Sequence, residues 1–179
     1  PRDLYLYWRA CSLAARGYAA LVVDLFGDVD GSGWDTDFAR PRMQQLRDDR
    51  ALLQGRMLAG LEALRAQPTV DGARCATLGY CLGGRASLDL ARTGADLRAA
   101  VSFHGVLDAL PPQLVAPHVP ARLLICDGAR DPMNSEESRA ALRQQLAVLN
   151  CDYEFVSYGL AQHGFTCPAQ VLNDAPGFG

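Results

Sequence analysis

The chain has 179 residues, of which 49% are hydrophobic and 21% charged, and its net charge is −3. This length and composition predict a single globular domain over residues 1–179 and exclude a disordered or fibrous protein. The small negative charge offers no basic surface to nucleic acid, and no apolar run reaches the roughly 18 to 20 residues of a membrane span. We therefore expect a soluble protein that acts on small molecules, with no nucleic-acid or membrane partner.

The basic residues and the cysteines limit the reaction mechanisms and metal sites that this chain can form. All 17 basic residues are Arg, which excludes a lysine Schiff base or lysine general base. The six cysteines contain no CxxC pair and only three histidines accompany them, so we expect no metal site and no cofactor. Cys75, Cys126 and Cys151 lie in or beside strand-like runs, where Cys acts as a small hydrophobic residue, and this predicts a reduced, cytoplasmic chain.

Hydrophobic spacing predicts alternating helices and strands. The predicted helices cover residues 2–16, 43–64, 85–93 and 134–149. The predicted strands cover residues 19–23, 75–78, 99–103, 122–126 and 153–156, and residues 26–40 form a loop. Asn134 and Glu137 have the spacing of a capping box at the start of the last helix. Apolar strands alternating with helices predict an α/β fold, with a parallel sheet covered by helices on both faces and ligands bound beyond the carboxyl ends of its strands.

The segment Gly-Tyr-Cys-Leu-Gly-Gly at residues 79–84 joins the strand over 75–78 to the next helix. A strand that turns directly into a helix strains the residue at the turn, and glycines two positions to either side let the elements cross closely. Cys81 is that residue, as in the nucleophile elbow of α/β-hydrolases with Cys in place of Ser, and the N–H of Leu82 is the expected oxyanion donor. The alternative is a glycine-rich turn with a buried, inert Cys.

A thiol nucleophile needs a base, and the base needs an orienting acid. In α/β-hydrolases the order along the chain is nucleophile, acid, His. Asp131 follows the strand over 122–126, and His163 follows the last strand. The order and the positions at strand ends predict a triad of Cys81, His163 and Asp131.

Four other polar residues compete for these roles. Asp127 is nearer its strand but more typical of the turn itself. His104 follows the strand over 99–103 but precedes the acid, so it lines the pocket or serves a turn. We expect His118, in a Pro-rich loop, to face solvent, and Asp24 to be a turn or cap residue.

With these residues in place, the chain resembles the dienelactone hydrolase family. The resemblance spans most of the chain: Gly17-Tyr18, residues 23–27, the elbow, the segment around Asp131, and His163-Gly164-Phe165-Thr166. It implies an α/β-hydrolase fold in which Cys81 attacks an ester or lactone carbonyl, His163 carries the proton and Asp131 orients His163. We also expect Tyr80, His104 and Phe165 to line the substrate pocket.

Two features depart from the family pattern. Members that hydrolyse dienelactone hold its carboxylate with two Arg, at positions that carry Asp28 and Cys167 here, so we expect an ester or lactone without a matching carboxylate. Alternative cations are Arg40, Arg42 and Arg130. The family's second oxyanion donor and a Glu near the thiol precede the first helix predicted here. We therefore expect a fold that lacks N-terminal strands and a C-terminal helix, and a chain that is part of a longer polypeptide.

The sequence leaves two functional hypotheses. The first is a carboxylic ester hydrolase, similar to carboxymethylenebutenolidase, that cleaves small esters or lactones through Cys81. The second is a non-catalytic thiol redox sensor or ligand-binding module on the same scaffold, since a Cys at a helix N-terminus can react with oxidants. The sequence carries no signal for an oligomeric state.

Overall fold

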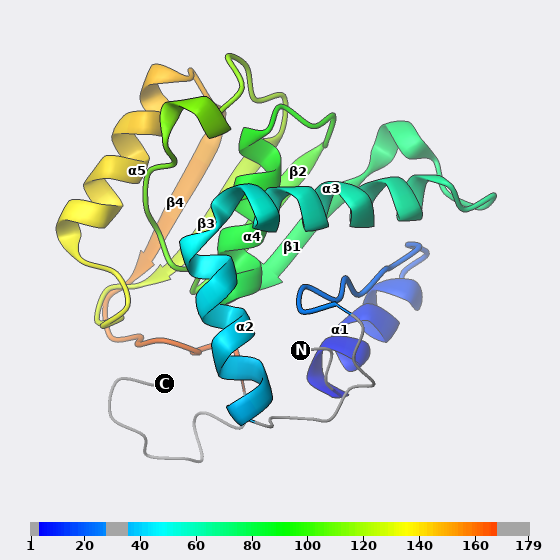
Figure 1. The fold of residues 1–179 in the computed structure, drawn as a ribbon, viewed down its shortest axis with the longest axis horizontal. Coiled ribbons are helices and arrows are strands. Elements are labelled where there is room, and N and C mark those ends of the chain that lie inside the picture. Colours follow the sequence, from blue (N-terminus) through cyan, green and yellow to red (C-terminus); the bar gives the residue numbers. More distant parts are fainter. Residues whose placement is uncertain (1–3, 28–35, 168–179) are drawn as a thin grey trace. The chain divides into compact units, whose positions relative to one another are not determined.

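The computed structural model describes residues 4–27 and 36–167 (Figure 1). The chain divides into two compact units, residues 1–72 and 73–179, and each is described by itself. The first unit contains helices and the segment around residue 20. The second contains the sheet and the predicted triad.

The first unit contains α1 (Leu4–Ala14), α2 (Thr36–Asp48) and α3 (Arg50–Arg65). The prediction of one helix over 43–64 was wrong, because the helical region begins at Thr36 and is interrupted at Asp49. The Asp49 carboxylate accepts a hydrogen bond of 2.8 Å from the Leu52 N–H and caps α3. Asp is favoured at this position because its side chain satisfies a free N–H at the helix start. Of the predicted loop over 26–40, residues 28–35 lie outside the described residues.

The predicted strand over residues 19–23 is also absent from the described structure. A strand is stabilised by hydrogen bonds to a neighbouring strand, and no described strand pairs with this segment. It lies instead against α3. A Cβ added at Gly60 would be 2.8 Å from Val23 Cγ2, and the Arg56 side chain donates to the Leu25 carbonyl.

The second unit contains a parallel sheet, as predicted. Its strands are β1 (Ala76–Tyr80), β2 (Ala99–Phe103), β3 (Arg122–Gly128) and β4 (Tyr153–Tyr158), arranged in the order β1-β2-β3-β4. The helices are α4 (Leu82–Arg92) and α5 (Glu136–Val148), with short 3-10 turns at Gly72–Arg74 and Pro112–Leu114. All strands point the same way, so their carboxyl ends meet at one edge of the sheet.

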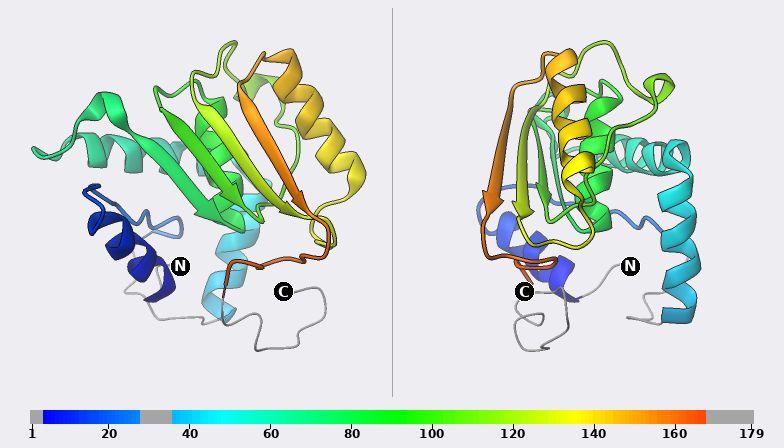
Figure 2. Two further views of the ribbon diagram at one scale, coloured as in Figure 1. Left: turned by 180° about the vertical axis from the view of Figure 1, so that it is seen from behind. Right: turned by 90° about the vertical axis from the view of Figure 1, so that its left-hand side faces the viewer.

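Helices α4 and α5 lie on the same face of this sheet (Figure 2). Thr77 of β1 is hydrogen-bonded to Ser87 of α4 at 3.1 Å, and the Arg143 guanidinium of α5 lies 4.8 Å from the Phe155 ring centroid. The core between sheet and helices is apolar, as burial of hydrophobic surface requires. The buried apolar residues of the sheet and of these two helices include Ala86, Leu88, Leu90, Ala100, Leu123, Ile125, Leu142 and Leu146.

The start of α5 corrects the predicted capping box. Ser135, not Asn134, is the N-cap residue, and its hydroxyl accepts a hydrogen bond of 3.2 Å from the Ser138 N–H. Asn134 is buried, and its side chain bonds to Gly105 and Asp127. The prediction was displaced by one residue because Asn and Ser are both good caps and only tertiary contacts separate them.

Three further properties concern the chemistry of the chain. All six cysteines are free thiols. Within residues 4–27 and 36–167, no group of three or more His, Cys, Asp or Glu side chains is arranged to hold a metal ion. None of the described helices has the length and apolar character needed to cross a bilayer.

Candidate active site

Cys81 lies at the turn between β1 and α4, in the conformation that the sequence predicted. Its φ is 54° and its ψ is −119°, a region that costs an L-residue energy. The close crossing of strand and helix requires Gly79, where a Cβ would lie 2.0 Å from the Gly83 carbonyl oxygen. Gly84 is constrained less severely, because its Cβ would lie 2.6 Å from Ser102 Oγ and 3.0 Å from Gly105 Cα, whereas a Cβ at Gly83 would meet nothing within 4 Å. The downstream glycine that the packing requires is therefore Gly84 rather than Gly83.

The three residues predicted to form a triad lie within hydrogen-bond distance of one another. His163 Nε2 is 3.0 Å from Cys81 Sγ, and His163 Nδ1 is 2.8 Å from Asp131 Oδ2. His163 and Asp131 are 4% and 3% exposed. Cys81 follows β1, Asp131 follows β3 and His163 follows β4, so the parallel sheet brings together groups that are 82 and 32 residues apart.

The electrostatics of this group favour an ion pair. Burial opposes ionisation of Cys81, but the hydrogen bond and charge of His163 and the Leu82 N–H outweigh it and hold the thiol pKa below its ordinary value. Burial likewise disfavours charge on His163, yet its hydrogen bonds and charge interactions with Asp131 and Cys81 raise its pKa to about 10. Both shifts favour a thiolate beside an imidazolium over the neutral pair.

The N–H of Leu82 lies at the first residue of α4 and is hydrogen-bonded to the Cys81 sulfur. This N–H has no partner within the helix because it belongs to the first turn. It is thus available to the Cys81 sulfur at the positive end of the helix.

His104 is a second buried imidazole beside the first. Its ring centroid lies 5.2 Å from that of His163, and its Nε2 is hydrogen-bonded to Thr166 Oγ1 at 2.9 Å. Burial, followed by the charge of His163, lowers the pKa of His104 to about 4. The residue is therefore neutral near pH 7. Its φ of 39° shows that it also forms the turn at the end of β2.

The other two predicted pocket residues lie in an aromatic group around His104. The Phe165 ring is 5.4 Å from His104, and the Tyr80 ring is 6.0 Å from it. Two further aromatic residues of this group were not predicted: Phe103, which stacks on Tyr80 at 5.3 Å, and Tyr158, which lies 5.1 Å from Phe165. Their positions at the carboxyl ends of β2 and β4 were the only signal that could have identified them.

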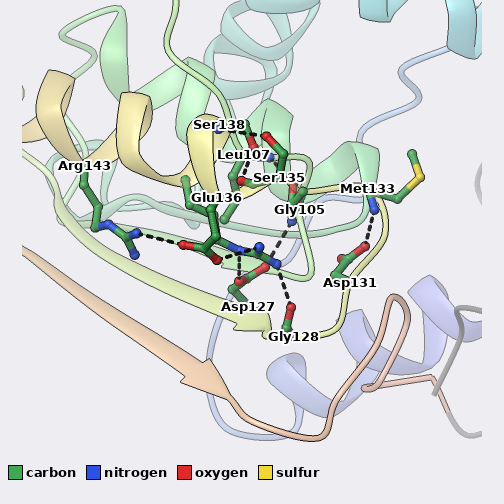
Figure 3. Close-up of polar contacts among 12 residues, drawn as sticks. Gly105, Leu107, Asp127, Gly128, Asp131, Met133, Ser135, Glu136, Ser138 and Arg143 are labelled. Atoms are coloured by element: carbon green, nitrogen blue, oxygen red, sulfur yellow. Dashed lines mark hydrogen bonds and ion pairs between the residues drawn. The ribbon is translucent and has the colours of Figure 1, made fainter.

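The competing residues have other roles. Both carboxylate oxygens of Asp127 are occupied, by Asn134 at 3.0 Å and by Arg139 at 2.7 Å (Figure 3). His118 is exposed, as predicted. Asp24 accepts hydrogen bonds from the N–H groups of Phe26 and Gly27, which is the predicted turn role.

The positions that depart from the family pattern are only partly described. Asp28 lies outside the described residues. Cys167 is half-buried, and its N–H donates to the Gly164 carbonyl at 2.8 Å. Of the alternative cations, Arg42 lies over the Phe38 ring at 3.6 Å. Arg130 is exposed directly before Asp131.

A strained residue between strand and helix, with an acid and a His after later parallel strands, defines the α/β-hydrolase class. The sequence profile described as "Dienelactone hydrolase family" matches residues 9–175, and the chain belongs to this family. The predicted α/β fold class is thereby confirmed.

Solved structures and a curated relative agree with this assignment. The crystal structure of the dienelactone hydrolase-like promiscuous phosphotriesterase P91 from metagenomic libraries is 36% identical, with a TM-score of 0.90 over 99% of this chain and 73% of that one. The solved structure of m3DLH is 39% identical, with a TM-score of 0.88 over 99% of this chain and 73% of that one. A probable 2-oxo-3-(5-oxofuran-2-ylidene)propanoate lactonase from Bradyrhizobium sp is 27% identical over 91% of this chain and 68% of its own length.

Proposed function

We propose that the protein is a cysteine hydrolase that cleaves small esters or lactones through a triad of Cys81, His163 and Asp131. The observation that supports this most directly is the unbroken chain of contacts from Cys81 Sγ through His163 to Asp131, at 3.0 and 2.8 Å. These distances lie within the range needed for proton transfer. The family assignment supports the hydrolase class independently.

The proposed reaction begins with the Cys81 thiolate. Its sulfur attacks the acyl carbon, and the negative charge that develops on the carbonyl oxygen is stabilised by the Leu82 N–H. The His163 imidazolium then donates its Nε2 proton to the departing alkoxide, which leaves an acyl thioester on Cys81 and a free alcohol. In a lactone, the alcohol stays attached to the acyl group.

The second half of the reaction reverses these roles. Neutral His163 removes a proton from water, the resulting hydroxide attacks the thioester, and the carboxylic acid leaves as the thiolate is restored. Asp131 accepts a hydrogen bond from His163 Nδ1 throughout. It therefore keeps Nε2 facing the sulfur and stabilises the imidazolium.

The substrate class follows from the relatives and from the two positions described above. The Bradyrhizobium relative is named a probable lactonase and P91 a promiscuous phosphotriesterase, so lactones, esters and phosphotriesters are the substrates to assay. Because Asp28 and Cys167 occupy the positions where the resemblance implies two carboxylate-binding Arg, we propose a substrate without a carboxylate at that point.

A nitrophenyl ester tests the nucleophile. We expect a burst of nitrophenol equal to the enzyme concentration, followed by slower turnover as the thioester is hydrolysed. Cys81→Ala should abolish both phases. Cys151→Ala is the matched control, since it removes a half-buried thiol two residues before β4, whose pKa is raised by burial. Retained turnover in Cys81→Ala would exclude the proposed nucleophile.

The thiol-sensor hypothesis is supported by the same lowered pKa of Cys81. In that case the thiolate would attack one oxygen of hydrogen peroxide, forming a sulfenic acid and releasing hydroxide. Peroxide-dependent modification of Cys81 with no turnover of esters, lactones or phosphotriesters would favour the sensor. Turnover with an acyl-enzyme burst would favour the hydrolase.

A further inference from the structure

A buried polar cluster lies directly behind the loop that carries Asp131. It consists of Asp127 at the end of β3, Asn134 before α5, and Arg139 in α5, which are 0%, 4% and 5% exposed. None of these side chains contributes to the reaction proposed above. Polar groups this deeply buried cost free energy unless they are paired, so the geometry of their pairing indicates what they hold in place.

Arg139 fixes the end of β3. Its Nε donates to Asp127 Oδ2 at 2.7 Å, and its Nη2 donates to the Gly128 carbonyl at 2.9 Å. Its Nη1 reaches Glu136 Oε1 at 2.9 Å. The planar guanidinium thus grips the carboxylate and the adjacent carbonyl together, which a point charge cannot do. The first turn of α5 is thereby joined to the residue at which the Asp131 loop begins.

Asn134 fixes the other end of the same loop. Its Nδ2 donates to Asp127 Oδ1 at 3.0 Å and to the Gly105 carbonyl at 2.9 Å, and its Oδ1 accepts from the Leu107 N–H at 2.8 Å. Both amide hydrogens and the oxygen are engaged, so the side chain has one orientation. It also connects the Asp131 loop to the loop that follows His104.

Asp131 is held between these two anchors. Its N–H donates to the Gly128 carbonyl at 3.0 Å, and its own carbonyl accepts from the Asn134 N–H at 3.3 Å. Its Oδ1 accepts from the Met133 N–H at 2.8 Å, which leaves Oδ2 directed at His163. The loop is also held from the other side, where the Ala129 and Arg130 N–H groups donate to the Tyr158 and Ala161 carbonyls at 3.0 Å. A displacement of about 1 Å at a catalytic group can cost a factor of about 10² in rate.

We propose that Asp127, Asn134 and Arg139 are positioning residues, which hold the Asp131 loop in the one geometry that presents Oδ2 to His163 Nδ1. The inference rests on the proposed function of the triad. It goes beyond it by assigning a catalytic effect to three residues that touch neither the substrate nor the reacting atoms.

The chain provides a matched control of the same chemical type. Asp89 and Arg92 of α4 form another buried ion pair, 2.8 Å apart, with side chains 0% and 1% exposed. Arg92 is the last residue of α4, whereas Cys81 precedes the first, so the two lie about 16 Å apart along the helix axis. Removal of Arg92 breaks this buried ion pair and its hydrogen bond of 2.7 Å to Gln145 of α5, but changes no residue of the Asp131 loop.

The experiment compares Asn134→Ala, Arg139→Gln and Arg139→Lys with Arg92→Gln, using a nitrophenyl ester from about pH 5 to pH 11. In Asn134→Ala and Arg139→Gln we expect kcat/KM to fall by about 10- to 100-fold, mostly in kcat. In the plot of kcat/KM against pH, the fall of activity at high pH (the basic limb) should move to lower pH by about one unit. The reason is that a displaced Asp131 no longer holds the proton on His163. Arg139→Lys keeps the charge but loses the planar fork, and should lie between these variants and the wild type. Arg92→Gln should lower thermal stability and leave the basic limb unchanged.

The outcomes separate this inference from the proposed function. If folded Arg139→Lys and Asn134→Ala proteins show the wild-type basic limb, the cluster is structural only and the inference is overturned. The same holds if Arg92→Gln moves the limb as far as Arg139→Gln does. If Cys81→Ala or Asp131→Asn retains full activity, the triad itself fails. Should Arg139→Gln not fold, the Arg139→Lys profile alone decides, because Lys preserves the buried ion pair.

Discussion

Replacing Asp131 with Asn removes one negative charge from the proposed triad while preserving the shape of the side chain. In the wild type, Oδ1 accepts from the Met133 N–H and Oδ2 faces His163 Nδ1, each at 2.8 Å. In the variant, the amide oxygen must remain on the Met133 N–H, so the NH₂ group is turned toward His163. An NH₂ group donates to Nδ1 only if Nδ1 carries no proton, and the proton of neutral His163 is then on Nε2, facing the sulfur. In this tautomer His163 cannot accept a proton from the thiol or from water.

The magnitude follows from the charges. The hydrogen bond and charge of Asp131 are among the interactions that raise the pKa of His163 to about 10. Loss of this adjacent opposite charge should therefore lower the pKa of His163 in the variant. The thiolate–imidazolium pair is then less populated at neutral pH. Together with the wrong tautomer, this should reduce kcat/KM by a factor of about 10² or more.

Two assays measure the effect. The pH dependence of kcat/KM for a nitrophenyl ester should show a basic limb at lower pH than in the wild type, and the rate of Cys81 alkylation by iodoacetamide should fall near pH 7. Asp152→Asn is the matched control. It makes the same substitution in an exposed ion pair, in which the Asp152 side chain is 66% and the Arg122 side chain 79% exposed. It should change neither the pH dependence of kcat/KM nor the rate of Cys81 alkylation. An Asp131→Asn protein with native stability, wild-type kcat/KM and an unmoved basic limb would refute the assignment of Asp131.

Three further predictions follow from the same structure. Gly84→Ala should lower the free energy of unfolding in urea by about 1 to 3 kcal/mol, since its Cβ would lie 2.6 Å from Ser102 Oγ. Gly83→Ala, whose Cβ would meet nothing within 4 Å, should be neutral or stabilising. Equal destabilisation by the two substitutions would contradict the packing argument. His104→Asn should make the free energy of unfolding fall less steeply as pH is lowered. The pKa of His104 is about 4 in the folded chain and about 6.5 in the unfolded chain. Its contribution to stability, up to about 3 kcal/mol, is therefore present above pH 6.5 and is lost as pH falls through 4. Asn accepts the positive φ of this position, and identical curves of unfolding free energy against pH for wild type and variant would show that His104 does not titrate in this way. After treatment with one equivalent of iodoacetamide near pH 6, peptide mapping should find Cys81 modified first, because its thiol pKa is lowered. Cys126 and Cys151 should react later, since burial raises their pKa values. Preferential labelling of exposed Cys11 would count against a reactive Cys81 thiolate.

The sequence by itself determined the features that depend on short spacing. The elbow around Cys81 was predictable because a direct strand-to-helix turn requires glycines at fixed offsets. The order of Asp131 and His163 after their strands was predictable because parallel strands bring their carboxyl ends to one edge. The same local rules predicted the four strands of the described sheet.

Features that depend on neighbours distant in sequence were decided only by the tertiary structure. Residues 19–23 have the composition of a strand, but a strand also requires a hydrogen-bonded partner, and none is present among the described residues. Asn134 has the propensity of a cap, yet its side chain satisfies buried groups on two other segments, and Ser135 takes the cap instead. Composition does not encode such contacts.

The choice between Asp131 and Asp127 shows the same division. Asp127 lies at the end of β3 and Asp131 follows the strand, and the sequence ranked them only by turn statistics. The fold directs Asp131 at His163 and encloses Asp127 between Asn134 and Arg139. The pKa values of Cys81, His104 and His163 arise in the same way, because burial and a neighbouring charge come from segments that meet only when the sheet forms.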